Sequence, residues 1–230
     1  MRAHPDWLPY LGPMIGFGAA LSLADYLPDT SPVILLALRV IIPGAIFGYF
    51  LAIKAYPELA APRLKDLPLD VFVGLLATLI WVAPYLVWPG LRPDPPEGWD
   101  VSAAGDDMRL AMLALRFIGF VCITPFIEEL LVRNFLMRSV DAYREDKDFT
   151  EIPIGMFTWW SFAVTLGWFT FTHVQWEWPV AFLTGILYNV WIYRRKRMGS
   201  VILAHAVTNA SLFFWVVLGS TEVQDLWFFL

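Results

Sequence analysis

Residues 108–138, MRLAMLALRFIGFVCITPFIEELLVRNFLMR, decide the fold class of this chain. This apolar stretch is longer than the roughly 20 residues that an α-helix needs to cross a bilayer. Similar stretches occupy approximately 7–27, 32–53, 69–88, 156–174, 178–193 and 200–219. The sequence therefore predicts an all-α, polytopic membrane helix bundle with about seven transmembrane helices.

The composition supports a membrane protein and excludes several other classes. Of 230 residues, 58% are hydrophobic and 16% are charged, whereas a soluble domain is about half apolar and a quarter charged. The net charge of −5 argues against a nucleic-acid partner. The single cysteine, Cys122, excludes an intramolecular disulfide framework. We expect a single membrane domain over residues 1–230, with the first apolar stretch retained as a helix.

The basic residues predict the orientation in the membrane. Most of the 16 Lys and Arg residues precede the first span or follow the second, fourth and sixth, including the run 194–197. Because cytoplasmic loops are enriched in Lys and Arg, we expect the N-terminus in the cytoplasm. The stretch 89–107 is rich in Pro, Gly and Asp and indicates a solvated connection on the opposite side.

Charged residues inside the fourth span need an explanation, because ionisable groups in a bilayer are costly. Glu129 and Arg133 are four residues apart, so they share one helix face and are expected to pair. Glu128 is rotated by about 100° from Glu129, and Thr124 and Val132 occupy the positions four residues away. Glu128 is therefore the carboxylate left without a helical partner.

Two histidines also lie within apolar spans. Phe169 and His173 share one helix face, as do His205 and Asn209. A carboxylate beside an imidazole can take a proton from water, and an imidazole with an amide one turn away can stabilise an oxyanion. These are the groups that amide hydrolysis needs. A buried polar cluster that only locks helix packing is the alternative.

Other hydrolytic sites fit the sequence less well. There is no HExxH motif of the common zinc proteases and no GxSxG nucleophile motif. A mononuclear metal site made by Glu128, His173 and His205 stays open, since two histidines and one carboxylate form a known ligand set.

Together, EExxxR (Glu128, Glu129, Arg133), FxxxH (Phe169, His173) and HxxxN (His205, Asn209) follow one another on successive spans. In this order they resemble the CAAX protease and bacteriocin-processing family of intramembrane glutamate endopeptidases, also called the CPBP or Abi family. The resemblance covers roughly residues 108–219, the expected catalytic core. The chain also resembles a bacterial subgroup of CAAX prenyl protease-related proteins associated with exosortase systems.

The resemblance implies a role for each motif residue. Glu128 and His173 would activate the attacking water, and His205 and Asn209 would form the oxyanion hole. The remaining motif residues would support the site (Glu129, Arg133) or line the substrate cavity (Phe169). We therefore expect a cofactor-free, metal-independent protease of the bacterial inner membrane that cleaves a membrane-anchored or lipidated protein. A metal-dependent protease, a proton-coupled transporter and a non-proteolytic immunity scaffold are the alternatives.

Overall fold

The computed structural model describes residues 6–27, 30–93, 100–101, 104–219 and 229–230. Within these residues the secondary structure is helical and contains no strand. The main helices are α1 (Leu8–Tyr26), α2 (Pro32–Ala52), α3 (Leu67–Val87), α4 (Arg109–Phe117), α5 (Thr124–Glu129), α6 (Met137–Glu145), α7 (Trp159–Phe171), α8 (Trp178–Arg195) and α9 (Met198–Leu218). The π-helical segments η4 (Ile118–Ile123) and η5 (Leu130–Leu136) join α4, α5 and α6 into one continuous helical stretch. The predicted all-α class is confirmed.

The chain divides into two compact units. Unit 1 comprises 1–57, 98–127 and 213–230, and unit 2 comprises 58–97 and 128–212. Two of the four boundaries fall between Ile127 and Glu128 and between Leu212 and Phe213, so both EExxxR and HxxxN lie in unit 2. The prediction of a single membrane domain stays a prediction.

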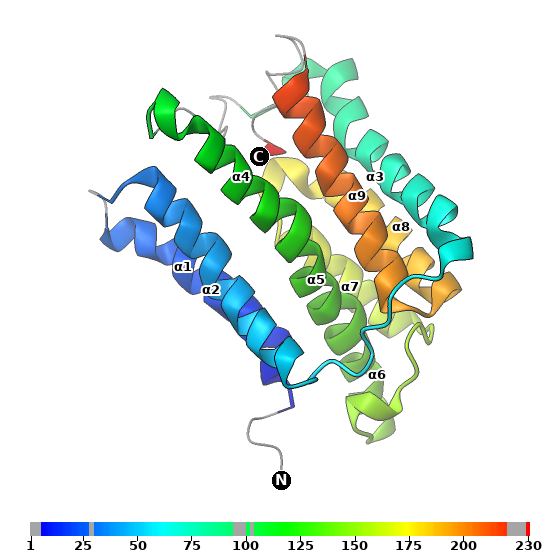
Figure 1. The fold of residues 1–230 in the computed structure, drawn as a ribbon. Coiled ribbons are helices and arrows are strands. Elements are labelled where there is room, and N and C mark those ends of the chain that lie inside the picture. The colour runs from blue at the N-terminus through cyan, green and yellow to red at the C-terminus, as the bar shows by residue number, and fades with distance from the viewer. Residues whose placement is uncertain (1–5, 28–29, 94–99, 102–103, 220–228) are drawn as a thin grey trace. The chain divides into compact units, whose positions relative to one another are not determined.

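Unit 1 is built by close apolar packing. Helices α1 and α2 lie side by side (Figure 1), and α4 packs against α2. A Cβ atom on Gly16 of α1 would lie 2.5 Å from the Cδ1 methyl of Ile46 on α2. Glycine therefore allows these two helices to approach more closely than any larger residue at this position.

Unit 2 combines apolar packing with buried ion pairs. Helix α7 packs against α6 and α8, and α8 packs against α3. The Arg195 guanidinium at the end of α8 pairs with Asp66 and Asp70 at the start of α3, each at 3.0 Å. Helix α3 also approaches α9 closely at Gly74, whose carbonyl oxygen accepts a 2.9 Å hydrogen bond from Thr208 Oγ1. These contacts fix the helices that carry the motif residues.

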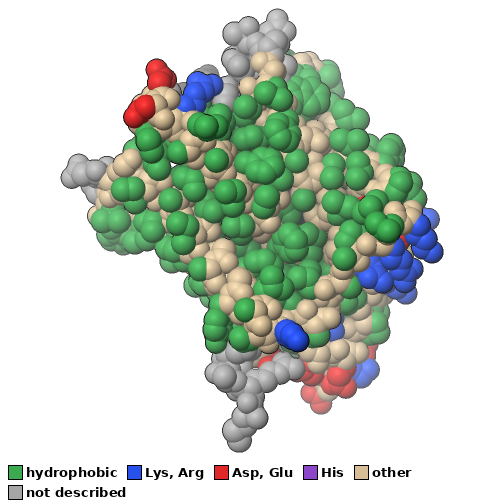
Figure 2. Space-filling view, viewed as in Figure 1, with side chains coloured by type: hydrophobic (Ala, Val, Ile, Leu, Met, Phe, Trp, Pro, Cys, Tyr) green, Lys and Arg blue, Asp and Glu red, His purple; other side chains and the backbone are tan. Residues whose placement is uncertain are grey.

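Four helical stretches are long and apolar enough to cross a membrane by length and composition: Pro32–Ala52, Leu64–Val87, Asp106–Glu145 and Met198–Leu218. In the view of Figure 2, hydrophobic side chains cover most of the face. Several large apolar side chains are strongly exposed, among them Ile41 (59%) and Phe72 (60%). Such a surface is typical of an integral membrane protein, because exposed apolar side chains are favourable in contact with lipid and unfavourable in contact with water.

Two predicted spans differ in length from the observed helices. The fourth continues past residue 138 to Glu145. The fifth is shorter: α7 has 13 residues, or about 20 Å at 1.5 Å per residue, less than the roughly 30 Å hydrocarbon core. The helix begins at Trp159, because the Thr158 side chain caps the amide of Ser161, and it therefore does not extend back to residue 156. Within the connection 89–107, residues 94–99 and 102–103 lie outside the described residues. The number of spans stays a prediction.

Candidate active site

The two adjacent glutamates lie on a short α-helical segment between two π-helical segments. Glu128 and Glu129 end α5, and η5 begins at the next residue, Leu130. Segments of π-helix widen the turn locally and are frequent at functional sites. The π-helical irregularity of the backbone therefore adjoins Glu128 and Glu129.

Glu129 and Arg133 form the expected ion pair. Arg133 Nη1 lies 3.1 Å from Glu129 Oε1, and both side chains are completely buried. A buried charge is tolerated when it is paired and hydrogen-bonded, and this pair satisfies that requirement. The spacing of four residues was sufficient to predict the contact.

His205 joins the same pair from α9. Its Nδ1 lies 2.8 Å from Glu129 Oε1, the oxygen that also accepts from Arg133. An ionised carboxylate only accepts hydrogen bonds, so Nδ1 of His205 carries the proton in this contact. The remaining ring nitrogen, Nε2, then faces Glu128. The sequence did not predict this second use of Glu129.

Glu128 differs from Glu129 in its surroundings. Its Oε2 lies 3.9 Å from His205 Nε2, and 24% of its side chain is exposed. This separation exceeds a direct hydrogen bond. A separation of 3.9 Å leaves room for one water molecule to hydrogen-bond to both Glu128 Oε2 and His205 Nε2 at about 2.8 Å from each. The carboxylate is thus accessible to water, whereas that of Glu129 is not.

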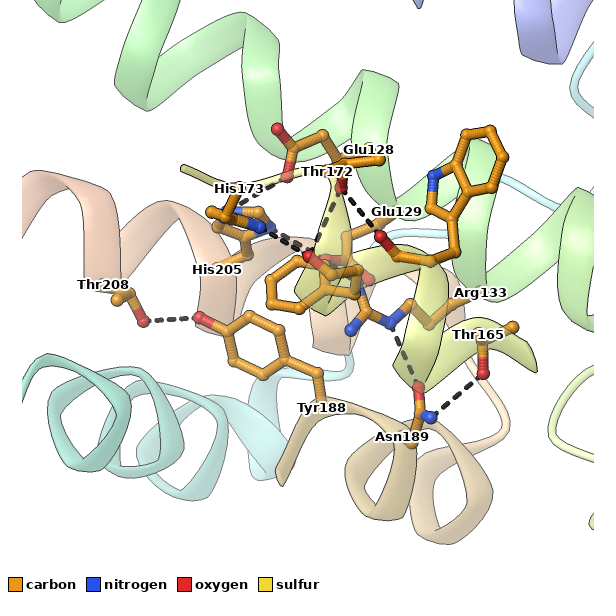
Figure 3. A network of polar contacts seen from close by, with 12 residues as sticks. Glu128, Glu129, Arg133, Thr165, Thr172, His173, Tyr188, Asn189, His205 and Thr208 are labelled. Atoms are coloured by element: carbon orange, nitrogen blue, oxygen red, sulfur yellow. Dashed lines mark hydrogen bonds and ion pairs between the residues drawn. The ribbon is translucent and has the colours of Figure 1, made fainter. Parts of the chain in front are cut away.

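His173 follows the end of α7 and faces the same region (Figure 3). Glu128 and His205 both interact electrostatically with its ring. Its Nδ1 lies 2.5 Å from the carbonyl oxygen of Phe169, and its own carbonyl accepts from Trp178 Nε1 at 3.0 Å. The ring also packs against Trp81 of α3, with 5.5 Å between centroids. These contacts hold the imidazole although it lies outside regular helix.

Phe169 packs against both imidazoles and the guanidinium. Its ring centroid lies 4.7 Å from that of His173 and 6.5 Å from that of His205. The guanidinium carbon of Arg133 lies 4.2 Å above the same ring. Phe169 is 3% exposed, so in this structure it forms the apolar floor on which the charged groups rest.

Asn209 lies one helical turn beyond His205 on α9. The two side chains are 5% and 6% exposed and share a helix face. Gly74 of α3 lets that helix approach the neighbouring face of α9: a Cβ at Gly74 would lie 2.5 Å from the carbonyl oxygen of Ala204. The close approach positions α9 and, with it, both polar residues.

The structure also places residues in this network that the motifs did not reveal. Asn189 accepts from Arg133 and donates to Thr165 (Figure 3), and Tyr188 hydrogen-bonds to Thr208 at 2.7 Å. Asn189 is fully buried in a helix rich in apolar residues. An amide in such a helix is itself a signal, by the same argument that selected the histidines.

Among the described residues, no three His, Cys, Asp or Glu side chains form a group suited to hold a metal ion. Glu128, His173 and His205 therefore do not assemble as the ligand set considered from the sequence.

Two basic residues within the apolar spans, Arg39 and Arg116, lie away from this network, in unit 1. Arg116 donates to the carbonyl oxygen of Leu230, and Arg39 is buried at its Nε atom.

A comparison with protein families identifies the region that carries these motifs. Residues 110–211 match the family described as type II CAAX prenyl endopeptidase Rce1-like. This part of the chain is Rce1-like. The Rce1-like segment is a little under half of the chain and contains every motif residue named above. No curated protein and no solved structure matches the chain.

The match confirms the resemblance to the CAAX protease family. An Rce1-like segment on apolar helices supports an intramembrane protease, and the CAAX protease family that it resembles acts on membrane-associated proteins. The more specific link to exosortase systems stays a prediction.

Proposed function

We propose that this chain is an intramembrane endopeptidase that hydrolyses a peptide bond of a membrane-anchored or lipidated protein with water activated by Glu128. One observation supports it above all. The His205 imidazole lies between two carboxylates, 2.8 Å from the buried Glu129 and 3.9 Å from the partly exposed Glu128. The buried carboxylate orients the ring, and the accessible one is placed to receive a proton from water.

In the proposed reaction Glu128, assisted by His173, takes one proton from a water molecule. The hydroxide attacks the carbonyl carbon of the scissile bond, and the carbonyl oxygen becomes an oxyanion. Asn209 donates to that oxyanion through its amide, and His205 does so through Nε2 in the form in which both ring nitrogens carry a hydrogen from the start of the reaction. Glu128 returns its proton to the amide nitrogen, and the carbon–nitrogen bond breaks. The products are an amine and a carboxylic acid, which gives its proton to the amine or to solvent and becomes a carboxylate.

The remaining motif residues support these groups. Glu129 and Arg133 hold the His205 ring, as their 2.8 Å and 3.1 Å contacts indicate. Phe169 contributes to the floor of the substrate cavity. The proposed route uses Glu128 and His173 to activate water and needs no metal.

Replacing Glu128 by Gln tests the proposal. Purified protein in proteoliposomes would receive membrane-anchored peptides with and without a prenyl group, and products would be identified by mass spectrometry. We expect Glu128→Gln to lower kcat by about a hundredfold to ten-thousandfold, as for loss of a general base. Glu145→Gln, on an exposed side chain, is the matched control. Full cleavage by Glu128→Gln would refute the proposal, and cleavage lost on chelation but restored by a metal ion would refute the metal-free route.

We also propose that the protein resides in a bacterial inner membrane with its N-terminus in the cytoplasm, from the distribution of Lys and Arg. In a Cys122→Ser background, an impermeant thiol reagent added to spheroplasts should label Asp107→Cys. It should label Lys147→Cys only after permeabilisation. The reverse pattern would invert the orientation.

A further inference from the structure

We propose that Asn189 is a positioning residue, braced by Thr165, that fixes Arg133 and through Glu129 the His205 ring. The inference rests on the proposed protease function and adds to it a residue that none of the three motifs contains. Asn189 lies on α8, 56 residues after Arg133 in sequence, and is fully buried.

The hydrogen bonds of Asn189 determine which way its amide points. Thr165 Oγ1 donates to the carbonyl oxygen of Ser161 at 2.6 Å, so its single proton is already used. The same oxygen can then only accept the 3.0 Å contact from Asn189 Nδ2. Asn189 Oδ1 must therefore face Arg133, where it accepts from Nε at 3.3 Å. Thr165 thus sets the orientation of the amide, together with the carbonyl oxygen of Phe162, which accepts a longer 3.4 Å contact from the same Nδ2.

Arg133 needs this acceptor because it is completely buried. Its Nη1 binds Glu129, its Nε binds Asn189, and its plane lies over Phe169 at 4.2 Å. Its Nη2 has no hydrogen-bond partner among the described residues. Without the oxygen of Asn189, the buried guanidinium would keep one side-chain hydrogen bond in the described part of the chain and would be free to rotate. A buried donor left unsatisfied costs free energy, so we expect the Arg133 guanidinium to move to a new position when it loses this acceptor.

The effect of such a rotation would reach the proposed reaction centre. Glu129 Oε1 accepts from both Arg133 and His205, so a shift of the guanidinium displaces the carboxylate and then the imidazole. A displacement of about 1 Å can lower a rate a hundredfold. Because Asn189 acts through Arg133 rather than on the substrate, kcat should fall while KM stays nearly unchanged.

The experiment compares Asn189→Leu, Thr165→Val and Thr165→Ser in the proteoliposome cleavage assay, with Glu128→Gln beside them. We expect Asn189→Leu to lower kcat about tenfold to hundredfold at nearly constant KM. Thr165→Val should lower kcat less than Asn189→Leu does, and Thr165→Ser should keep wild-type kcat. The double variant that combines Asn189→Leu with Thr165→Val should be no slower than Asn189→Leu alone. Thr184→Val, which removes a buried hydroxyl from α8, is the matched control and should retain wild-type kcat.

Each outcome decides the inference. Folded Asn189→Leu with wild-type kcat overturns it, as does a double variant whose two effects simply multiply. A loss of kcat by Thr184→Val equal to that of Asn189→Leu also overturns it, because general packing would then explain both. If Asn189→Leu does not fold, the Thr165 pair decides: equal kcat for Val and Ser overturns the brace. Wild-type cleavage by Glu128→Gln would instead refute the protease mechanism itself.

Discussion

Units 1 and 2 are both helical, yet the helices within each unit pack against one another through different kinds of contact. In unit 1, α1 and α2 meet through small residues, so that Gly16 accommodates the methyl of Ile46. In unit 2, α8 reaches α3 through the ion pairs of Arg195, and His205 of α9 contacts Glu129 at the end of α5. Apolar packing tolerates small displacements, whereas a buried charge does not once its partner moves. The unit that contains the completely buried ion pair of Glu129 and Arg133 is the one that carries the candidate site.

The largest stability effect should come from breaking the buried pair. Arg133→Met leaves Glu129 without its permanent positive charge and should cost about 3–5 kcal/mol of unfolding free energy. Thermal unfolding in detergent measures this, with Arg144→Met, at the exposed end of α6, as the control. A melting temperature equal to wild type would show that the pair is not what distinguishes unit 2.

A smaller effect is expected where two helices of unit 2 approach closely. A Cβ on Gly74 would lie 2.5 Å from the carbonyl oxygen of Ala204 and 2.7 Å from Cβ of Val207. Neither atom can move without shifting α9, so Gly74→Ala should cost about 1–3 kcal/mol and reduce cleavage. Unfolding and cleavage are measured on the same preparation. Unchanged cleavage would mean that the placement of α9 is not critical.

The matching substitution in unit 1 should be milder. At Gly16 the nearest atom to an added Cβ is the terminal methyl of Ile46, which can rotate away, and the next is 3.3 Å distant. Gly16→Ala should therefore cost about 1 kcal/mol and leave kcat unchanged. A larger loss for Gly16→Ala than for Gly74→Ala would reverse the comparison between the units.

The smallest effect is expected for an exposed ion pair. Lys147 Nζ lies 2.6 Å from Glu145 Oε2, but both side chains are more than 40% exposed. Solvent and salt screen such contacts, so Lys147→Ala should leave both the melting temperature and kcat unchanged. A measurable fall in melting temperature would show that ion pairs stabilise unit 2 regardless of burial.

Much of the architecture followed from local sequence, because a membrane helix satisfies its backbone within one segment. The apolar runs predicted the all-α membrane fold, and the four-residue spacing predicted the contact between Glu129 and Arg133. The same spacing correctly put Phe169 beside His173. The length of α7 was less predictable, since its start depends on the cap at Thr158 and not on hydropathy.

What the tertiary structure alone decided is which distant groups meet. Sequence separates Glu129 from His205 by 76 residues and Arg133 from Asn189 by 56, and no periodicity links such positions. Side-chain packing chose Glu129, rather than Glu128, as the partner of His205 Nδ1, and left Glu128 the more accessible acid. Helical spacing therefore determined the pairs within one helix, whereas the contacts between helices, which assemble the candidate site, depended on how α5, α7, α8 and α9 fold against one another.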